Sequence, residues 1–72
     1  MDKKTFLDLK LYQKLLWKSS PNSKAVVKGQ VVLVDNGKLI VQWEEGNRQM
    51  FLKWVIRDGN RYDSLIEHTI KV

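Results

Sequence analysis

The first quarter of the chain has apolar residues at a helical spacing. In TFLDLKLYQKLLWK, leucines recur every four residues at Leu7, Leu11 and Leu15, and this spacing places them on one face of a helix. The pattern predicts an amphipathic helix over about 5–18. The segment that follows, SSPNSK, is rich in turn-forming residues. We therefore expect a linker over 19–24.

The rest of the chain changes to a period of two. The segments AVVKGQVVLV, LIVQWEE and RQMFLKWVI alternate apolar and polar residues, are rich in β-branched side chains and are separated by short turns. They predict a β-meander over about 25–72. Asn36-Gly37 is a strong hairpin signal because both residues readily adopt positive φ, and Gly29 is expected at a bulge or bend. For the last residues the pattern leaves strand and helix open.

Both faces of the expected third strand carry apolar residues, so the sheet must be covered on both sides. A bent sheet that closes into a small barrel, with the N-terminal helix packed against it, accounts for this pattern. The predicted fold class is α+β, mainly β: a single domain over 1–72 with an SH3-like or tudor-like antiparallel barrel. Trp43, Trp54 and Phe6 are expected in its core.

Part of the chain also resembles a known family. GQVVLVDNGKLIVQWEEGNRQMF, with GNRYDSL further on, is similar to the SH3-like domain of Mind-bomb and HERC ubiquitin ligases from about Gly29 to Leu65. The matching residues are Gly29, Val31, Val41, Gln42, Trp43, Glu44, Gly46, Phe51, Tyr62, Asp63 and Leu65. Tudor, chromo and retroviral-integrase barrels carry similar hairpins. The resemblance implies a barrel and a binding module that contacts other proteins.

A second, shorter resemblance implies a different partner. WVIRDGNRY, near the end of the chain, looks like the wing of phage excisionases, which are small basic DNA-binding proteins. The lysine-rich, cysteine-free composition is in keeping with a phage or mobile element as the source.

Positive charge is concentrated at one end of the sequence. The net charge is +5, and residues 1–28 hold seven lysines against two aspartates, whereas residues 29–72 hold six basic and six acidic groups. Such asymmetry favours an anionic partner for the basic half. The alternative is a lysine-rich face that only keeps the protein soluble.

The expected binding residues are cations that a phosphate backbone can contact. Lysines 10, 14 and 18 would form one stripe on the predicted helix, opposite the leucines, and arginines near turns would add to it. The candidates for nucleic-acid binding are Lys10, Lys14, Lys18, Lys24, Lys28, Arg48, Arg57 and Arg61. Phe51 and Tyr62 are candidates for an aromatic surface groove, because their strand neighbours are polar.

Signals for catalysis are weak, so we expect no enzyme, no cofactor and no metal. Cysteine is absent, the single histidine is His68 near the end, and Glu44 and Glu45 flank a turn. No apolar run is long enough to cross a bilayer, and we expect a complete, small cytoplasmic protein without a membrane partner. The leading hypothesis is a nucleic-acid-binding accessory or regulatory protein; the alternative is a module that docks an acidic protein or peptide. The oligomeric state stays open.

Overall fold

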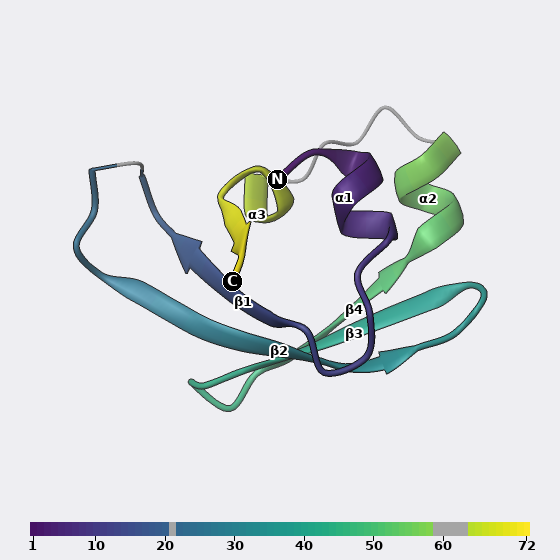
Figure 1. Cartoon of the computed structure of the whole chain (residues 1–72), viewed down its shortest axis with the longest axis horizontal. Coiled ribbons are helices and arrows are strands. Elements are labelled where there is room, and N and C mark those ends of the chain that lie inside the picture. The colour runs from purple at the N-terminus through teal and green to yellow at the C-terminus, as the bar shows by residue number, and fades with distance from the viewer. Residues whose placement is uncertain (21, 59–63) are drawn as a thin grey trace.

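A five-stranded antiparallel sheet forms the body of the protein, and three short helices lie on one side of it (Figure 1). The computed structural model describes residues 1–20, 22–58 and 64–72. The strands are β1 (Lys14–Lys18), β2 (Val26–Val34), β3 (Lys38–Trp43), β4 (Arg48–Leu52) and β5 (Thr69–Lys71), in the order β4-β3-β2-β1-β5. The helices are α1 (Lys3–Leu7), α2 (Lys53–Asp58) and α3 (Ser64–Glu67). The prediction of a mainly β fold is confirmed.

The predicted helix over 5–18 is wrong in its extent. Helix α1 ends after one turn, and β1 occupies the second half of the segment, between β2 and β5. The chain reverses in between at Tyr12, which has a positive φ of 67°. The Tyr12 amide donates to the Val31 carbonyl (2.7 Å), and the Val31 amide donates to Gln13 (2.9 Å). These bonds begin the pairing of β1 with β2, so tertiary pairing overrides the helical spacing.

The hairpin at Asn36-Gly37 is confirmed, although its turn differs from the expected one. Asp35 and Lys38 exchange backbone hydrogen bonds of 3.0 and 3.4 Å across it. Among the described residues only Tyr12 and Gly46 have a positive φ, so the turn lacks the left-handed pair that Asn-Gly favours. Instead, the Asp35 carboxylate accepts a hydrogen bond from the Gly37 amide (3.3 Å), which closes the turn through a side chain.

The predicted third strand is correct only in its first half. Strand β4 ends at Leu52, and α2 follows directly, so the expected alternation through Trp54 breaks. Trp54 is 58% exposed, and its assignment to the core is wrong. The helical turn instead buries Ile56 (6% exposed). The C-terminal segment, where strand and helix were both open, contains both: α3 and then β5.

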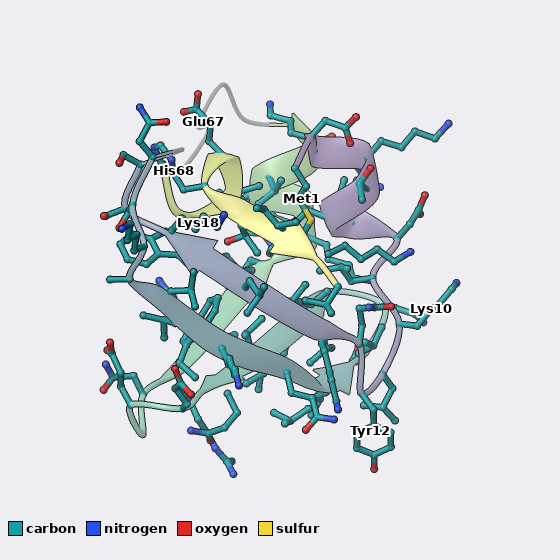
Figure 2. All side chains as sticks on the ribbon, turned by 60° about the vertical axis from the view of Figure 1, so that its left-hand side comes forward. Met1, Lys10, Tyr12, Lys18, Glu67 and His68 are labelled. Carbon is teal, nitrogen blue, oxygen red and sulfur yellow. The ribbon has the colours of Figure 1, made fainter. Side chains whose placement is uncertain are left out.

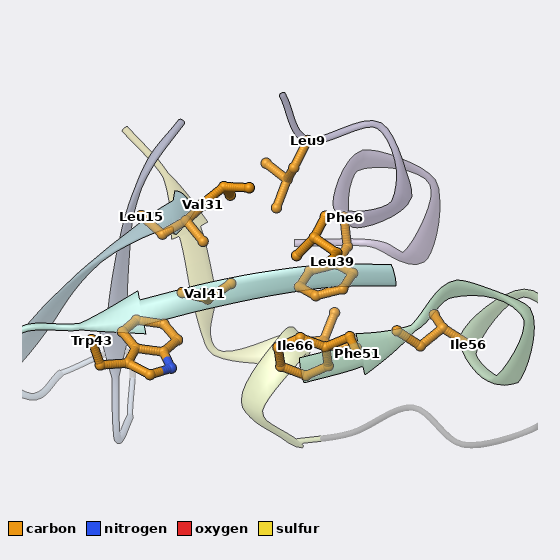
Figure 3. Packing of buried hydrophobic residues seen from close by; sticks show 10 residues of the cluster. All are labelled: Phe6, Leu9, Leu15, Val31, Leu39, Val41, Trp43, Phe51, Ile56 and Ile66. Atoms are coloured by element: carbon orange, nitrogen blue, oxygen red, sulfur yellow. The ribbon is translucent and has the colours of Figure 1, made fainter. Parts of the chain in front are cut away.

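The core lies between the inner face of the sheet and the helices (Figure 3). Its buried residues are Phe6, Leu9, Leu15, Val31, Leu39, Val41, Trp43, Phe51, Ile56 and Ile66. Phe6 packs edge-to-face on Phe51, with ring centroids 4.9 Å apart, and α1 contacts α2 beside them. The core positions expected for Phe6 and Trp43 are confirmed. The helices thus cover one end of this core, and Trp43 lies at the other end.

Gly29 is required by the packing of Trp43. The two residues are cross-strand partners on β2 and β3. A Cβ added at Gly29 would lie 2.5 Å from Cε3 and 2.6 Å from Cζ3 of the Trp43 indole, closer than real atoms approach. The predicted bulge is not at Gly29 itself, because the β2–β3 register shifts between Val31 and Leu33. The glycine therefore serves close approach of the ring to the backbone.

Replacing Gly29 tests this contact. We expect Gly29→Ala to cost about 1–3 kcal/mol of unfolding free energy, the usual range for overpacking a core. For a domain of this size that corresponds to a fall of several degrees in Tm, measured by thermal or urea denaturation. Gly37→Ala is the matched control, since a Cβ there meets nothing within 4 Å. Equal stability of the two variants would contradict the close approach.

Helix α1 is held by an acidic N-cap. The Asp2 carboxylate accepts a hydrogen bond from the Thr5 amide (2.8 Å), and bonding to Thr5 lowers the pKa of Asp2 below its ordinary value of 3.8. A carboxyl whose folded pKa is lowered stabilises the fold above its unfolded pKa and loses that effect as the pH falls through the folded value.

We therefore expect the destabilisation caused by Asp2→Ala to depend on pH. The loss of unfolding free energy should be largest near neutral pH. It should shrink below about pH 3.8, where the Asp2 carboxyl of the wild type becomes protonated and loses its charge. Urea denaturation of both proteins at pH 7 and pH 3 measures it. Asp2→Asn, which keeps the capping oxygen, is the control. A constant difference at both pH values would contradict the role of the charge.

Candidate nucleic-acid interface

Register places polar and basic residues together on the outer face of the sheet, away from the helices. Lys14 on β1 pairs with Gln30 on β2, Gln30 pairs with Gln42 on β3, and Gln42 pairs with Arg48 on β4. Directly paired residues of antiparallel strands point to the same face. The four residues therefore form one row across the sheet, with a cation at each end and two amides between them.

A second row brings further cations to this face. Lys28 on β2 pairs with Leu16 on β1, two residues along from the pair of Gln30 and Lys14. Lys18 lies two residues after Leu16, at the end of β1. An open groove of about 570 Å³ runs over this part of the sheet. Its walls include Lys14, Leu16, Lys28, Gln30, Gln42 and Glu44. We call it the basic groove.

The cations of the basic groove have no carboxylate partner among the described residues. The ion pair that the described residues contain joins Arg57 to Asp58 on α2 (2.9 Å). This pairing raises the pKa of Arg57 and lowers the pKa of Asp58. Glu44, the acidic wall residue, accepts a hydrogen bond from the Lys28 backbone amide (3.1 Å). Arg48 donates to the Gln42 side chain, which orients the guanidinium. The side chains that line the groove thus carry two positive charges against one negative charge.

The structure groups the predicted binding residues differently from the sequence interpretation. The stripe of Lys10, Lys14 and Lys18 on a helix is wrong, because Lys10 lies in the loop before β1 and Figure 2 shows it at the opposite end of that strand from Lys18. Lys24 is exposed in the loop before β2. The sheet brings together Lys14, Lys18, Lys28 and Arg48.

The remaining candidates lie elsewhere. Arg57 is on α2 in its ion pair, and Arg61 falls outside the described residues. Phe51 is 7% exposed under Phe6, so the expectation that it lines a surface groove is wrong; its partner Tyr62 also falls outside the described residues. The interpretation of the sequence missed Gln30 and Gln42, which strand register alone places between the cations.

A second hollow, of about 420 Å³, opens at the end of the core that the helices leave uncovered. Its walls are Trp17, Val27, Trp43, Glu45, Asn47, Arg48 and Gln49, and we call it the indole hollow. The Trp43 indole donates from Nε1 to Gln49 Oε1 (3.2 Å). The Trp17 Nε1 is buried and has no acceptor among the described residues. From the sequence alone, Trp17 is expected to be either a packing anchor or an exposed contact.

The basic groove and the indole hollow are adjacent. Trp43 lines both of them, and Arg48 belongs to the outer row of residues and to the rim of the hollow.

Among the described residues, no group of three or more histidine, aspartate or glutamate side chains lies close enough to hold a metal ion. None of the helices in this part of the chain has the length and apolar character that crossing a bilayer requires. Comparisons with protein-family models, curated proteins and solved structures found no match to the chain.

Proposed function

We propose that the protein is a non-enzymatic nucleic-acid-binding module that contacts the phosphate backbone through the basic groove. One observation carries the proposal: Lys14, Lys18, Lys28 and Arg48 share one face of the sheet without a carboxylate partner among the described residues. Cations so placed bind successive phosphates and release condensed counterions, which is the main source of non-specific affinity for nucleic acids.

The amides between the cations support the same function. Gln30 and Gln42 lie within the row that Lys14 and Arg48 terminate. Their NH2 groups donate to backbone carbonyls, Gln30 to Tyr12 (3.2 Å) and Gln42 to Trp43 and Asn47 (3.2 and 3.3 Å). The two amides therefore hold the surface between the cations in shape. A solubility role alone explains exposed lysines, but it gives no reason for a groove in which cations flank two glutamines.

A protein or peptide partner is less well supported. That alternative rested on a basic helix or on an aromatic groove at the surface. The lysines of the supposed helix belong to a loop and a strand, and Phe51 is buried. An acidic partner remains compatible with the charge of the groove, and the salt dependence described below separates it from a nucleic acid.

We also propose that the open sheet is an SH3-like barrel. Strands β1 to β4 follow one another in the sheet, and β5 returns to the free edge of β1. The long β2 pairs with β1 through its first half and with β3 through its second, and its register shift allows it to bend. Both features support a barrel whose outer surface includes the basic groove.

The proposal predicts a salt-dependent affinity that two lysines control. We expect the double variant Lys14→Gln, Lys28→Gln to bind a fluorescent oligonucleotide more weakly, in fluorescence-anisotropy titrations at several salt concentrations. The slope of log affinity against log salt should fall by roughly 0.7–0.9 for each phosphate that the variant no longer neutralises. Exposed substitutions of this kind usually change stability by less than about 0.5 kcal/mol.

The matched control removes the same charge from elsewhere. Lys4 is on α1, and Lys71 pairs with Leu15 and so faces away from the groove. Lys4→Gln with Lys71→Gln should leave the salt slope near that of the wild type. Equal effects of the two double variants would show that only net charge matters. No affinity of the wild type for DNA or RNA near 100 mM salt would contradict the proposed function.

A further inference from the structure

We infer that the indole hollow takes up an unpaired nucleobase, and that the protein therefore prefers single-stranded to double-stranded nucleic acid. This inference rests on the proposed function and adds the class of ligand. A base that is stacked and paired inside a duplex cannot enter a hollow in the protein, whereas a base in a single strand is free to do so.

The walls of the hollow have the chemistry that a base requires. Trp17 and Trp43 both line it, and the ring contact found among the described aromatic residues is that of Phe6 with Phe51. The two indoles therefore do not stack on each other. Trp43 is buried with its ring against Gly29, so the partly exposed Trp17 ring offers the face for a ligand. The volume of the indole hollow, about 420 Å³, lies within the range of roughly 300–1,000 Å³ that is usual for small-molecule sites.

The charge of the walls favours a neutral ring over a cation. Glu45 and Arg48 contribute one charge of each sign, and Asn47 and Gln49 contribute amides. The carbonyl of Gln49 accepts from Trp43, which leaves its NH2 group for ligand acceptors. The positive charge of Arg48 at the rim repels a methylated lysine, which is the other kind of ligand that paired aromatic rings bind.

The buried indole nitrogen of Trp17 points to the same conclusion. A buried donor without an acceptor is rare in native proteins, and its presence needs an explanation. Trp17 lies on β1 between its partners Val27 and Thr69, at the wall of the hollow. Because the indole N–H bonds to none of the described residues, an acceptor on a ligand would satisfy this donor without displacing a hydrogen bond to them.

The position of the hollow fits a strand that crosses the sheet. Arg48 joins the outer row of cations to the rim, and Trp43 is shared by both cavities. A chain whose phosphates lie along the basic groove can therefore turn one base over this edge of the sheet into the hollow.

The experiment compares single-stranded and duplex oligonucleotides of equal length in the Trp54→Leu variant. Trp54 is exposed on α2 and lines neither cavity, so its removal leaves Trp17 and Trp43 as the reporters. We expect Trp54→Leu to bind as the wild type does, and single strands to quench its tryptophan emission more than duplex does. Adding Trp17→Leu should weaken single-strand binding about 5- to 150-fold, the range of one base–aromatic stack. Trp17→Phe should restore most of it.

The outcomes separate the inference from the proposed function. Binding of single strands and duplex with equal affinity and without quenching would overturn the inference and leave the phosphate-binding groove in place. Quenching by a trimethyl-lysine peptide but not by oligonucleotides would also overturn it, in favour of a cation cage. If Trp17→Leu does not fold, the same measurements are made on Asn47→Ala, which changes the rim of the hollow. An unchanged preference for single strands and unchanged quenching would then contradict base binding in the hollow. Absence of any binding would instead remove the proposed function itself.

Discussion

The Trp43 indole packs directly against the backbone of Gly29, and both faces of the sheet are organised around this contact. A side chain at position 29 would collide with the ring. On the inner side, the ring ends the core opposite the helices and forms a wall of the indole hollow. On the outer side, the same pair of strands sets Gln30 beside Gln42 and Lys28 beside Glu44, because alternate residues of a strand point to opposite faces.

The two cavities are consequences of one register. A shift of one residue between β2 and β3 would exchange the faces and move the cations into the core. The Trp43–Gly29 pair opposes such a shift, since only glycine leaves room for the ring. Residues that resemble those of SH3-like domains, among them Val41 and Phe51, are buried and serve the fold. The proposed binding residues, such as Lys14 and Arg48, lie at the first positions of β1 and β4, at the two ends of the row that crosses the sheet.

The sequence predicted the strands from residue 26 to Leu52 well, because β-branched alternation and turn residues are local signals. It failed over 5–18 for a specific reason. Residues four apart share a face of a helix, but they also share a face of a strand, so the spacing of Lys14 and Lys18 fits both. Pairing with β2 and β5, which no local pattern reports, decides in favour of a strand. Trp54 was misplaced in the same way, since α2, which begins directly after β4, contacts α1 and buries Ile56, and alternation does not report this packing.

The contact between Trp43 and Gly29 can be observed directly by NMR spectroscopy. An indole held over a glycine shields its α-protons, so we expect Gly29 Hα resonances far upfield of their usual range. We also expect nuclear Overhauser effects from these protons to the six-membered ring of Trp43, whose Cε3 and Cζ3 lie closest to the glycine. Ordinary Gly29 shifts without such effects would contradict the register on which the basic groove and the indole hollow both depend.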